Sequence, residues 1–403
     1  MSFLTDRLYP RESAEFIVAN DTANIKLCQD GILKVAELIM KSNNFTEDTF
    51  FSLDVHPQVA NRKAIDWIFL VDTINFSFWS DDDVNFKVTF HDKQYTGYFA
   101  ACACINGALE GNIPITNSDY MENITEDDVR RIFKTDDGSE IPLLKERVEV
   151  INEAGRILNQ EFDGTFYNCI LKCNKSAIKL MEYVVEYFGS YRDFATYKGQ
   201  KISFLKRAQI LVSDIYSCMR KIDDACYFHD INELTMFADY RVPQALHFLG
   251  VLKYSSILMK QLNEKELLQN GSEYEVELRG FSIKACDDIV KAIQQKATDG
   301  SYTMYNAAYV DNFLWLYRRK NAKEIEEMIT NLLVLKLCII KQQTHMLPSL
   351  KSDLPIMMFA TTEIPFVAAA KIFSKRSTVR SCLLAINAPR APNAAPTLSY
   401  LLY

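Results

Sequence analysis

The chain has 403 residues, of which 48% are hydrophobic and 24% charged. This composition is typical of a folded globular protein and excludes intrinsic disorder over most of the length. The net charge of -7 argues against a protein that holds nucleic acid through a broad basic face, although a local phosphate site stays open.

Helical periodicity dominates the chain. The expected helices are two short ones within Ser13–Met40, separated at Asp21–Lys26, and then Leu143–Gln160, Ser176–Phe188, Phe204–Ile222, Pro243–Leu262, Ile283–Lys296, Tyr309–Arg318 and Lys323–Ile340. The β-branched and aromatic runs that predict strands are Ala64–Val71, Asn85–His91, Gln94–Phe99 and Tyr274–Leu278. The predicted fold class is therefore mainly α with a small β element.

The ten cysteines come without an apolar targeting segment in residues 1–19, so we expect buried, reduced thiols in the cytosol or nucleus. Cys102 and Cys104 form one close pair and Cys169 and Cys173 another, but neither has a nearby His. Gly-rich phosphate loops are missing. We expect no metal, no cofactor and, since no apolar run reaches about 18 residues, no membrane span.

The segment FADYRVP places Asp239 among Phe237, Tyr240 and Arg241, directly before a predicted helix. A carboxylate held among rings is partly desolvated, and it can act on developing positive charge or on a water. The alternative is an Asp that caps the helix or pairs with Arg241. Both interpretations stay open.

Two further segments carry candidate ligand contacts. In VDNFLWLY, Asp311 and Trp315 are four residues apart and share a helix face, where a carboxylate could bind the N–H edge of a base while a ring stacks on it. An ordinary amphipathic helix fits equally well. His56 stands before Pro57 in a loop, as a ligand contact or as a plain turn residue.

A basic cluster follows one predicted turn. Lys201, Lys206 and Arg207 lie beside aromatic residues, which fits either a phosphate site or a solvated helix face. The acidic run Ser80–Asp83 is typical of a turn or a helix cap; as a site for a divalent ion it matches no known loop spacing.

Seven ordered segments together resemble the queuosine salvage protein family, the queuosine 5'-phosphate N-glycosylases. The segments are SAEFI (Ser13–Ile17), DTINFSFW (Asp72–Trp79), YTGYF (Tyr95–Phe99), DGSEIPLLKERVEVINEAGRIL (Asp137–Leu158), FLKRAQIL (Phe204–Leu211), LTMFADYRVPQAL (Leu234–Leu246) and VDNFLWLYRR (Val310–Arg319). The resemblance ends near Ser381. We therefore expect one domain over residues 1–381 and an Ala/Pro-rich extension of low order, without a family counterpart, over residues 382–403.

The resemblance implies a fold similar to helix-hairpin-helix DNA glycosylases. It also implies hydrolysis of queuosine 5'-monophosphate, which releases queuine, a 7-deazaguanine base that is reinserted into tRNA. The family's catalytic aspartate falls on Asp239, and its base contacts fall on His56, Phe237 and Asp311. Lys206 and Arg207 are our candidates for the phosphate. We expect a cytoplasmic monomer that acts on a small molecule and does not bind nucleic acid directly.

The sequence departs from the family pattern at two base-contacting positions. Asn312 stands where the family has an aromatic residue, and Leu316 where it has an acidic one. Because these positions are four apart on one helix, we expect one contact to the amino or diol part of queuine to be lost or replaced.

These departures keep alternatives open. One is a protein that binds queuine or a nucleotide without catalysis, and another is a glycosylase for a related deazapurine nucleotide. A glycosylase acting on polymeric nucleic acid rests on fold analogy alone and is disfavoured by the pI of about 5.5. A bland helical scaffold would leave the FADYRVP segment unexplained.

Overall fold

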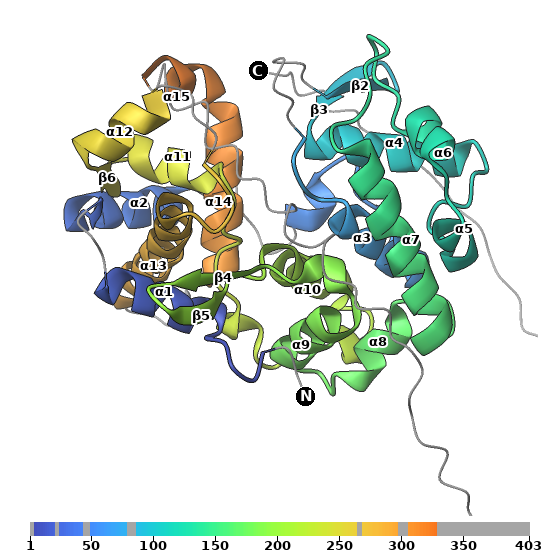
Figure 1. Cartoon of the computed structure of the whole chain (residues 1–403), viewed down its shortest axis with the longest axis horizontal. Coiled ribbons are helices and arrows are strands. Elements are labelled where there is room, and N and C mark those ends of the chain that lie inside the picture. The colour runs from blue at the N-terminus through green and yellow to red at the C-terminus, as the bar shows by residue number, and fades with distance from the viewer. Residues whose placement is uncertain are drawn as a thin grey trace, which may run out of the picture. The chain divides into compact units, whose positions relative to one another are not determined.

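The computed structural model describes residues 4–20, 24–42, 49–78, 86–263, 268–296 and 305–328. Within these ranges the chain is mainly helical, as predicted, with three two-stranded antiparallel sheets (Figure 1). The described residues belong to one compact unit, Met1–Pro348. None of the described helices combines the length and the apolarity that a membrane span requires. The predicted extension 382–403 lies outside the described residues.

The elements follow one another along the chain with short connections. The α-helices are α1 (Pro10–Ala19), α2 (Gln29–Lys41), α3 (Arg62–Thr73), α4 (Tyr98–Glu110), α5 (Ser118–Glu122), α6 (Glu126–Ile132), α7 (Leu144–Glu161), α8 (Tyr167–Lys172), α9 (Ala177–Tyr187), α10 (Lys206–Met219), α11 (Val242–Phe248), α12 (Ser256–Asn263), α13 (Glu273–Lys296), α14 (Ala307–Lys320) and α15 (Ala322–Met328). The strand pairs are β1 (Ile25–Leu27) with β6 (Leu252–Tyr254), β2 (Lys87–Phe90) with β3 (Lys93–Thr96), and β4 (Phe194–Tyr197) with β5 (Gln200–Ser203). Short 3-10 turns are η1 (Thr49–Ser52), η2 (Gly189–Tyr191), η3 (Asp224–Cys226) and η4 (Ile231–Glu233).

Amphipathic segments were predicted correctly. The helices expected over Leu143–Gln160, Ser176–Phe188, Phe204–Ile222 and Tyr309–Arg318 correspond to α7, α9, α10 and α14. The expected pairing of the strands near residues 85–99 is also confirmed, since β2 and β3 form a hairpin. Each of these segments has one buried and one exposed face, and this contrast is what a sequence pattern records.

Two predicted strands are wrong, and both belong to helices. Ala64–Val71 lies in α3, where nearly every side chain is buried, so no polar face marks the helical period. Tyr274–Leu278 lies in α13, and there Glu275 and Glu277 are buried rather than exposed. The alternation of charged and apolar residues in this segment therefore reflects buried ion pairs and hydrogen bonds, not a half-exposed strand.

Two other segments differ from the prediction, and a third predicted helix is described only in part. Pro243–Leu262 is not one helix: α11 ends before Gly250, whose φ of +76° reverses the chain into β6, and α12 follows. The run of small apolar residues that forms α4 was not predicted as a helix. Of the helix expected over Lys323–Ile340, α15 covers the first residues and the rest lies outside the described ranges.

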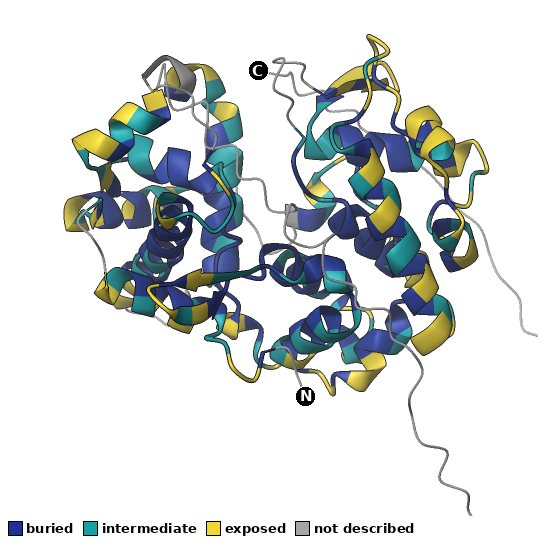
Figure 2. Cartoon of the chain, in the orientation of Figure 1, coloured by how far each residue is buried: buried dark blue, intermediate teal, exposed yellow. Residues whose placement is uncertain are grey.

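Two hydrophobic cores organise the described residues. One contains the buried faces of α3, α4, α7, α9 and α10, and the other gathers α1, α2, α11 and α14 around α13. Helix α13 is buried along most of its length (Figure 2). Helix α10 belongs to the first core and α14 to the second, and residues of both line the pocket described next.

Candidate active site

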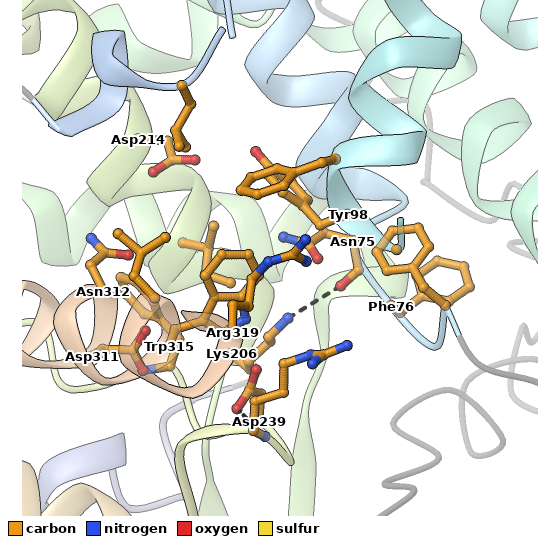
Figure 3. Close-up of a pocket in the computed structure, with 18 of the residues that line it drawn as sticks. Asn75, Phe76, Tyr98, Lys206, Asp214, Asp239, Asp311, Asn312, Trp315 and Arg319 are labelled. Carbon is orange, nitrogen blue, oxygen red and sulfur yellow. Dashed lines mark hydrogen bonds between the residues drawn. The ribbon is translucent and has the colours of Figure 1, made fainter. Parts of the chain in front are cut away.

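A pocket lies between the two cores (Figure 3). Its walls come from α10, α14, the start of α4, the segment 75–78 after α3, and the segment 237–241 before α11. The structure brings together all candidate residues except Lys201 and Arg207. Those that line the pocket are His56, Lys206, Phe237, Asp239, Asp311, Asn312 and Leu316.

Helix periodicity explains how two helices supply so much of the wall. On α10 the lining residues are Lys206, Ile210, Asp214 and Ser217, which are spaced by three or four and therefore share one face. On α14 the same spacing relates Asp311, Trp315 and Arg319, with Asn312 and Leu316 beside them. Each helix thus turns its opposite face to a core and this face to the pocket.

Asp239 is anchored through one carboxylate oxygen. Its Oδ1 accepts hydrogen bonds from the backbone N–H groups of Arg241 at 2.8 Å and Val242 at 3.0 Å, at the start of α11. Asp239 thus bonds to N–H groups at the start of α11 as a capping residue would, although the N-cap position itself is Arg241, and it also lines the pocket. No described residue bonds to its Oδ2, so one oxygen fixes the side chain and the other is available to a ligand.

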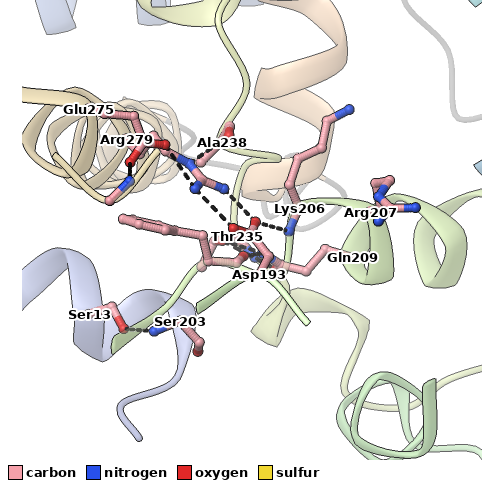
Figure 4. Close-up of polar contacts among 12 residues, drawn as sticks. Ser13, Asp193, Ser203, Lys206, Arg207, Gln209, Thr235, Ala238, Glu275 and Arg279 are labelled. Carbon is pink, nitrogen blue, oxygen red and sulfur yellow. Dashed lines mark hydrogen bonds and ion pairs between the residues drawn. The ribbon is translucent and has the colours of Figure 1, made fainter. Parts of the chain in front are cut away.

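A buried charge network supports this segment from behind (Figure 4). Arg279 donates from Nε to the carbonyl of Ala238 at 3.1 Å, next to Asp239. Its guanidinium also bonds to Asp193 and, at 3.1 Å, to Glu275. Asp193 in turn accepts from the backbone N–H of Lys206 at 3.0 Å. One arginine thus fixes both the Asp239 segment and the start of α10.

Asp311 and Lys206 lie close to Asp239 in the pocket. Oδ1 of Asp311 accepts from the backbone N–H of Phe237 at 3.0 Å, which ties α14 to the Asp239 segment. Burial, and then the neighbouring Asp239 carboxylate, raise the pKa of Asp311 well above its usual value. Burial lowers the pKa of Lys206, while Asp239 opposes that shift. The ammonium of Lys206 donates to the carbonyl of Asn75 at 3.3 Å.

His56 forms part of an aromatic wall. Its Nε2 is 3.0 Å from the hydroxyl of Tyr98, and its ring centroid lies 4.5 Å from that of Phe50. Burial lowers the pKa of His56 to about 4, so the imidazole is neutral at neutral pH. A neutral ring among aromatic neighbours suits contact with a flat, uncharged base.

The structure does not bring the whole predicted basic cluster into the pocket. Arg207 is buried beside it, and its guanidinium donates to the backbone carbonyls of Thr73, at 2.5 Å, and Ser190. Lys201 is exposed and pairs with Asp6. Neighbours in sequence diverge here because α10 begins at Lys206 and turns the next side chain about 100° away.

Two arginines from other elements lie in the pocket wall, where the sequence had predicted Arg207. Arg241 and Arg319 line the pocket, and Arg319 also lies 4.4 Å from the centre of the Phe99 ring. Burial, and then the positive charge of Arg241, lower the pKa of Arg319 to about 10, which leaves it protonated at neutral pH. The pocket thus holds three cations in its described wall, with Lys206 the third.

Asp214 lines the pocket and was missed from the sequence. The available signal was its spacing of eight residues from Lys206 in a helix that was itself predicted.

No group of three or more His, Cys, Asp or Glu among the described residues could hold a metal ion. The described cysteines are free and, apart from Cys28, buried, as expected. The acidic run Ser80–Asp83 lies outside the described residues.

Comparisons with known proteins identify the family of the chain. A model of the queuosine salvage protein family matches residues 55–334. The chain is 41% identical over 324 residues to a Mus musculus protein named queuosine 5'-phosphate N-glycosylase/hydrolase, covering 79% of this chain and 95% of the mouse protein. Proteins of the same name from Schizosaccharomyces pombe and Sphaerobacter thermophilus are each 36% identical, covering 75% and 71% of this chain and 89% and 85% of their own lengths. The chain belongs to the queuosine salvage protein family.

Proposed function

We propose that this protein hydrolyses the N-glycosidic bond of queuosine 5'-phosphate and releases queuine. Relatives that carry this activity in their names cover most of the chain. The observation that carries the proposal is Asp239, which is held by two backbone N–H groups through Oδ1 and lines a pocket with rings and cations around it. A bound nucleotide would meet a fixed carboxylate at its sugar.

The chemistry of glycoside cleavage suits such a carboxylate. The transition state resembles an oxocarbenium ion, in which positive charge develops on the sugar. Asp239 stabilises that charge and polarises the attacking water, and its two hydrogen bonds mean that no reorganisation is needed during the reaction. The capping role of Oδ1 and the catalytic role of Oδ2 are therefore compatible.

The remaining wall residues bind the rest of the nucleotide. Phe237, His56 and Asp311 contact the base, the first two through their rings and the third through hydrogen bonds to the polar edge of the base. Lys206 binds the phosphate, together with Arg241 or Arg319, which replace Arg207 in our proposal. These cations also explain how a protein with a net negative charge holds an anionic substrate.

Mass-spectrometric detection of free queuine tests this function. Purified protein is incubated with queuosine 5'-monophosphate beside the near-isosteric variant Asp239→Asn, which removes the charge. We expect the rate of queuine release to fall by on the order of 10²–10³ or more. Asp92→Asn, at an exposed turn, is the matched control and should retain full activity. Equal release by wild type and Asp239→Asn would move the chemistry to another residue.

A second candidate is binding without turnover, or turnover of a related deazapurine nucleotide. It is favoured by Asn312 and Leu316, which line the pocket where the family pattern has an aromatic and an acidic residue. Tight binding of queuosine 5'-monophosphate with no release of queuine would support a binding protein. Release from another deazapurine nucleotide at a higher kcat/KM would support a different substrate.

Other properties belong to the same proposal. The resemblance favours a fold of the helix-hairpin-helix glycosylase type, a monomer, and action on a free nucleotide without direct binding of nucleic acid. The reduced cysteines fit the cytoplasm, with the nucleus as a second compartment. Sedimentation measures the oligomeric state, and cell fractionation measures the compartment. The salt dependence of any tRNA binding measures direct contact with nucleic acid.

A further inference from the structure

Asp214 faces the pocket from the same side of α10 as Lys206, two helical turns further along. Eight residues of α-helix rise by about 12 Å, so these two side chains act on different parts of any ligand. In Figure 3, Asp214 and Asp239 lie at opposite ends of the view, with Trp315 and Lys206 between them. The proposed chemistry uses only the Asp239 end.

None of the described residues supplies a compensating charge to Asp214. It forms no hydrogen bond or ion pair with the described residues, and none of their cations acts on its carboxyl. Its neighbour Asp72 is fully buried, and Oδ2 of Asp72 has no hydrogen-bond partner in the same part of the chain. Burial raises the pKa of Asp214 to about 7, and burial followed by the Asp214 charge raises that of Asp72. An unpaired acidic group thus faces a cavity.

The other two carboxylates of the described pocket wall are each held by backbone hydrogen bonds, and the function proposed above uses them at the sugar and at the polar edge of the base. Asp239 bonds to two backbone N–H groups at the start of α11. Asp311 bonds to the backbone of Phe237 and lies near Lys206. By contrast, Leu316 offers no charge at the position where the family pattern is acidic. A cation on the ligand therefore has Asp214 as its available partner.

We propose that Asp214 is a specificity-determining residue that binds the protonated amine on the C7 substituent of the queuine base. The proposal rests on the function proposed above, in which the sugar lies at Asp239 and the base lies among the rings. An alkylamine is protonated at neutral pH, so it supplies the positive charge that no described residue offers to Asp214. A charge-assisted hydrogen bond forms in a site sheltered from water, where it is strongest.

The inference explains how the chain tolerates Leu316. A residue of α10, Asp214, then selects the substituted base, in place of the acidic residue that the family pattern has on α14 at position 316. A nucleotide without the amine leaves Asp214 unpaired in the pocket, and this penalty rejects it.

Two substrates that differ only in the substituent test the proposal. Queuosine 5'-monophosphate is compared with 7-deazaguanosine 5'-monophosphate, which lacks the amine, in wild type, Asp214→Asn and Asp214→Glu. We expect Asp214→Asn to lower kcat/KM for queuosine 5'-monophosphate by on the order of 10–100-fold, mainly through KM, and to raise kcat/KM for the unsubstituted nucleotide, because the penalty of the unpaired carboxylate is removed. Asp214→Glu, which keeps the charge, should restore part of the preference, and Asp72→Asn, at a buried residue that does not line the pocket, is the control that should retain it.

Equal losses on both substrates would give Asp214 a purely structural role and overturn the proposal, as would an unchanged preference in Asp214→Asn. A binding measurement separates this from the hydrolase proposal. If wild type releases no base from either nucleotide, the hydrolase proposal fails. Calorimetric Kd values for queuine and 7-deazaguanine then decide the role of Asp214, because only queuine should bind more weakly to Asp214→Asn.

Discussion

Asp239 and Asp214 line one pocket but differ in almost everything around them. Asp239 accepts two backbone hydrogen bonds, and a buried arginine holds the adjacent carbonyl. Asp214 has no such bonds within the described chain, and its nearest acidic neighbour, Asp72, is itself buried. One carboxylate is fixed before a ligand arrives, and the other lacks a partner until it does.

This difference shows how a pocket can separate catalysis from selection. A catalytic carboxylate works best when its charge is already oriented, because any reorganisation would add to the barrier. A selective carboxylate gains from being uncompensated, because the correct ligand then relieves a cost that an incorrect ligand leaves in place. The predictions below test whether the two ends behave in these two ways.

The largest effect is expected from the substitution of Arg279, the buried arginine that supports the Asp239 segment. Arg279→Met would leave Asp193 and Glu275 as buried charges without their partner. We expect the free energy of unfolding to fall by about 3–5 kcal/mol, measured by urea denaturation. Arg130→Met is the control, since Arg130 pairs with exposed acidic residues and should cost at most about 1 kcal/mol. Similar losses for both variants would mean that the buried network gives the Asp239 end no special support.

Substitution of Lys206 tests whether its charge binds the phosphate or another part of the substrate. Lys206→Met should raise KM for queuosine 5'-monophosphate by on the order of 10–100-fold and raise it much less for the nucleoside queuosine. Because Lys206 also acts on Asp239 and Asp311, kcat should fall for both substrates. Steady-state kinetics on the two substrates give the ratio. A KM increase of the same size for nucleotide and nucleoside would exclude Lys206 as the phosphate ligand.

The sequence predicted the Asp239 end better than the Asp214 end, for physical reasons. Asp239 and Asp311 stand in short segments rich in aromatic residues, so their neighbours in sequence are also their neighbours in space. The environment of Asp214 depends on Asp72 from α3, a helix whose uniform burial concealed its period and led to a predicted strand. A missing counter-ion is a property of the assembled pocket, and no local pattern records it.

Arg207 shows the converse error. Its place beside Lys206 in the sequence predicted a shared phosphate site, but two carbonyls from separate segments bind its guanidinium. One carbonyl belongs to Thr73 at the end of α3, and the other to Ser190 within the turn η2 that follows α9. Only the tertiary structure brings them to Arg207, so the helix period alone left both the buried and the pocket-facing interpretation open.

The smallest expected effect is a change in the stability of the ligand-free protein when Asp214 is substituted. It tests the contrast between Asp214 and Asp239 most directly. The pKa of Asp214 is raised to about 7 by burial, above its unfolded value, so the folded state holds this proton more tightly than the unfolded state does. The carboxyl therefore lowers stability progressively as pH rises from about 4 through 7. Asp214→Asn removes this titration, and its stability relative to wild type should increase by on the order of 1 kcal/mol between pH 6 and pH 8.

Urea denaturation of wild type and Asp214→Asn at the two pH values measures this change, without ligand. A variant that is more stable yet selects its substrate less well would show that the Asp214 charge serves the ligand and not the fold, as expected for groups whose stability cost is kept for function. A variant that is less stable than wild type at pH 8 would mean that Asp214 has a stabilising partner in the folded protein. In that case the contrast with Asp239 would no longer hold, and weaker binding by Asp214→Asn could not be attributed to the lost contact with the amine.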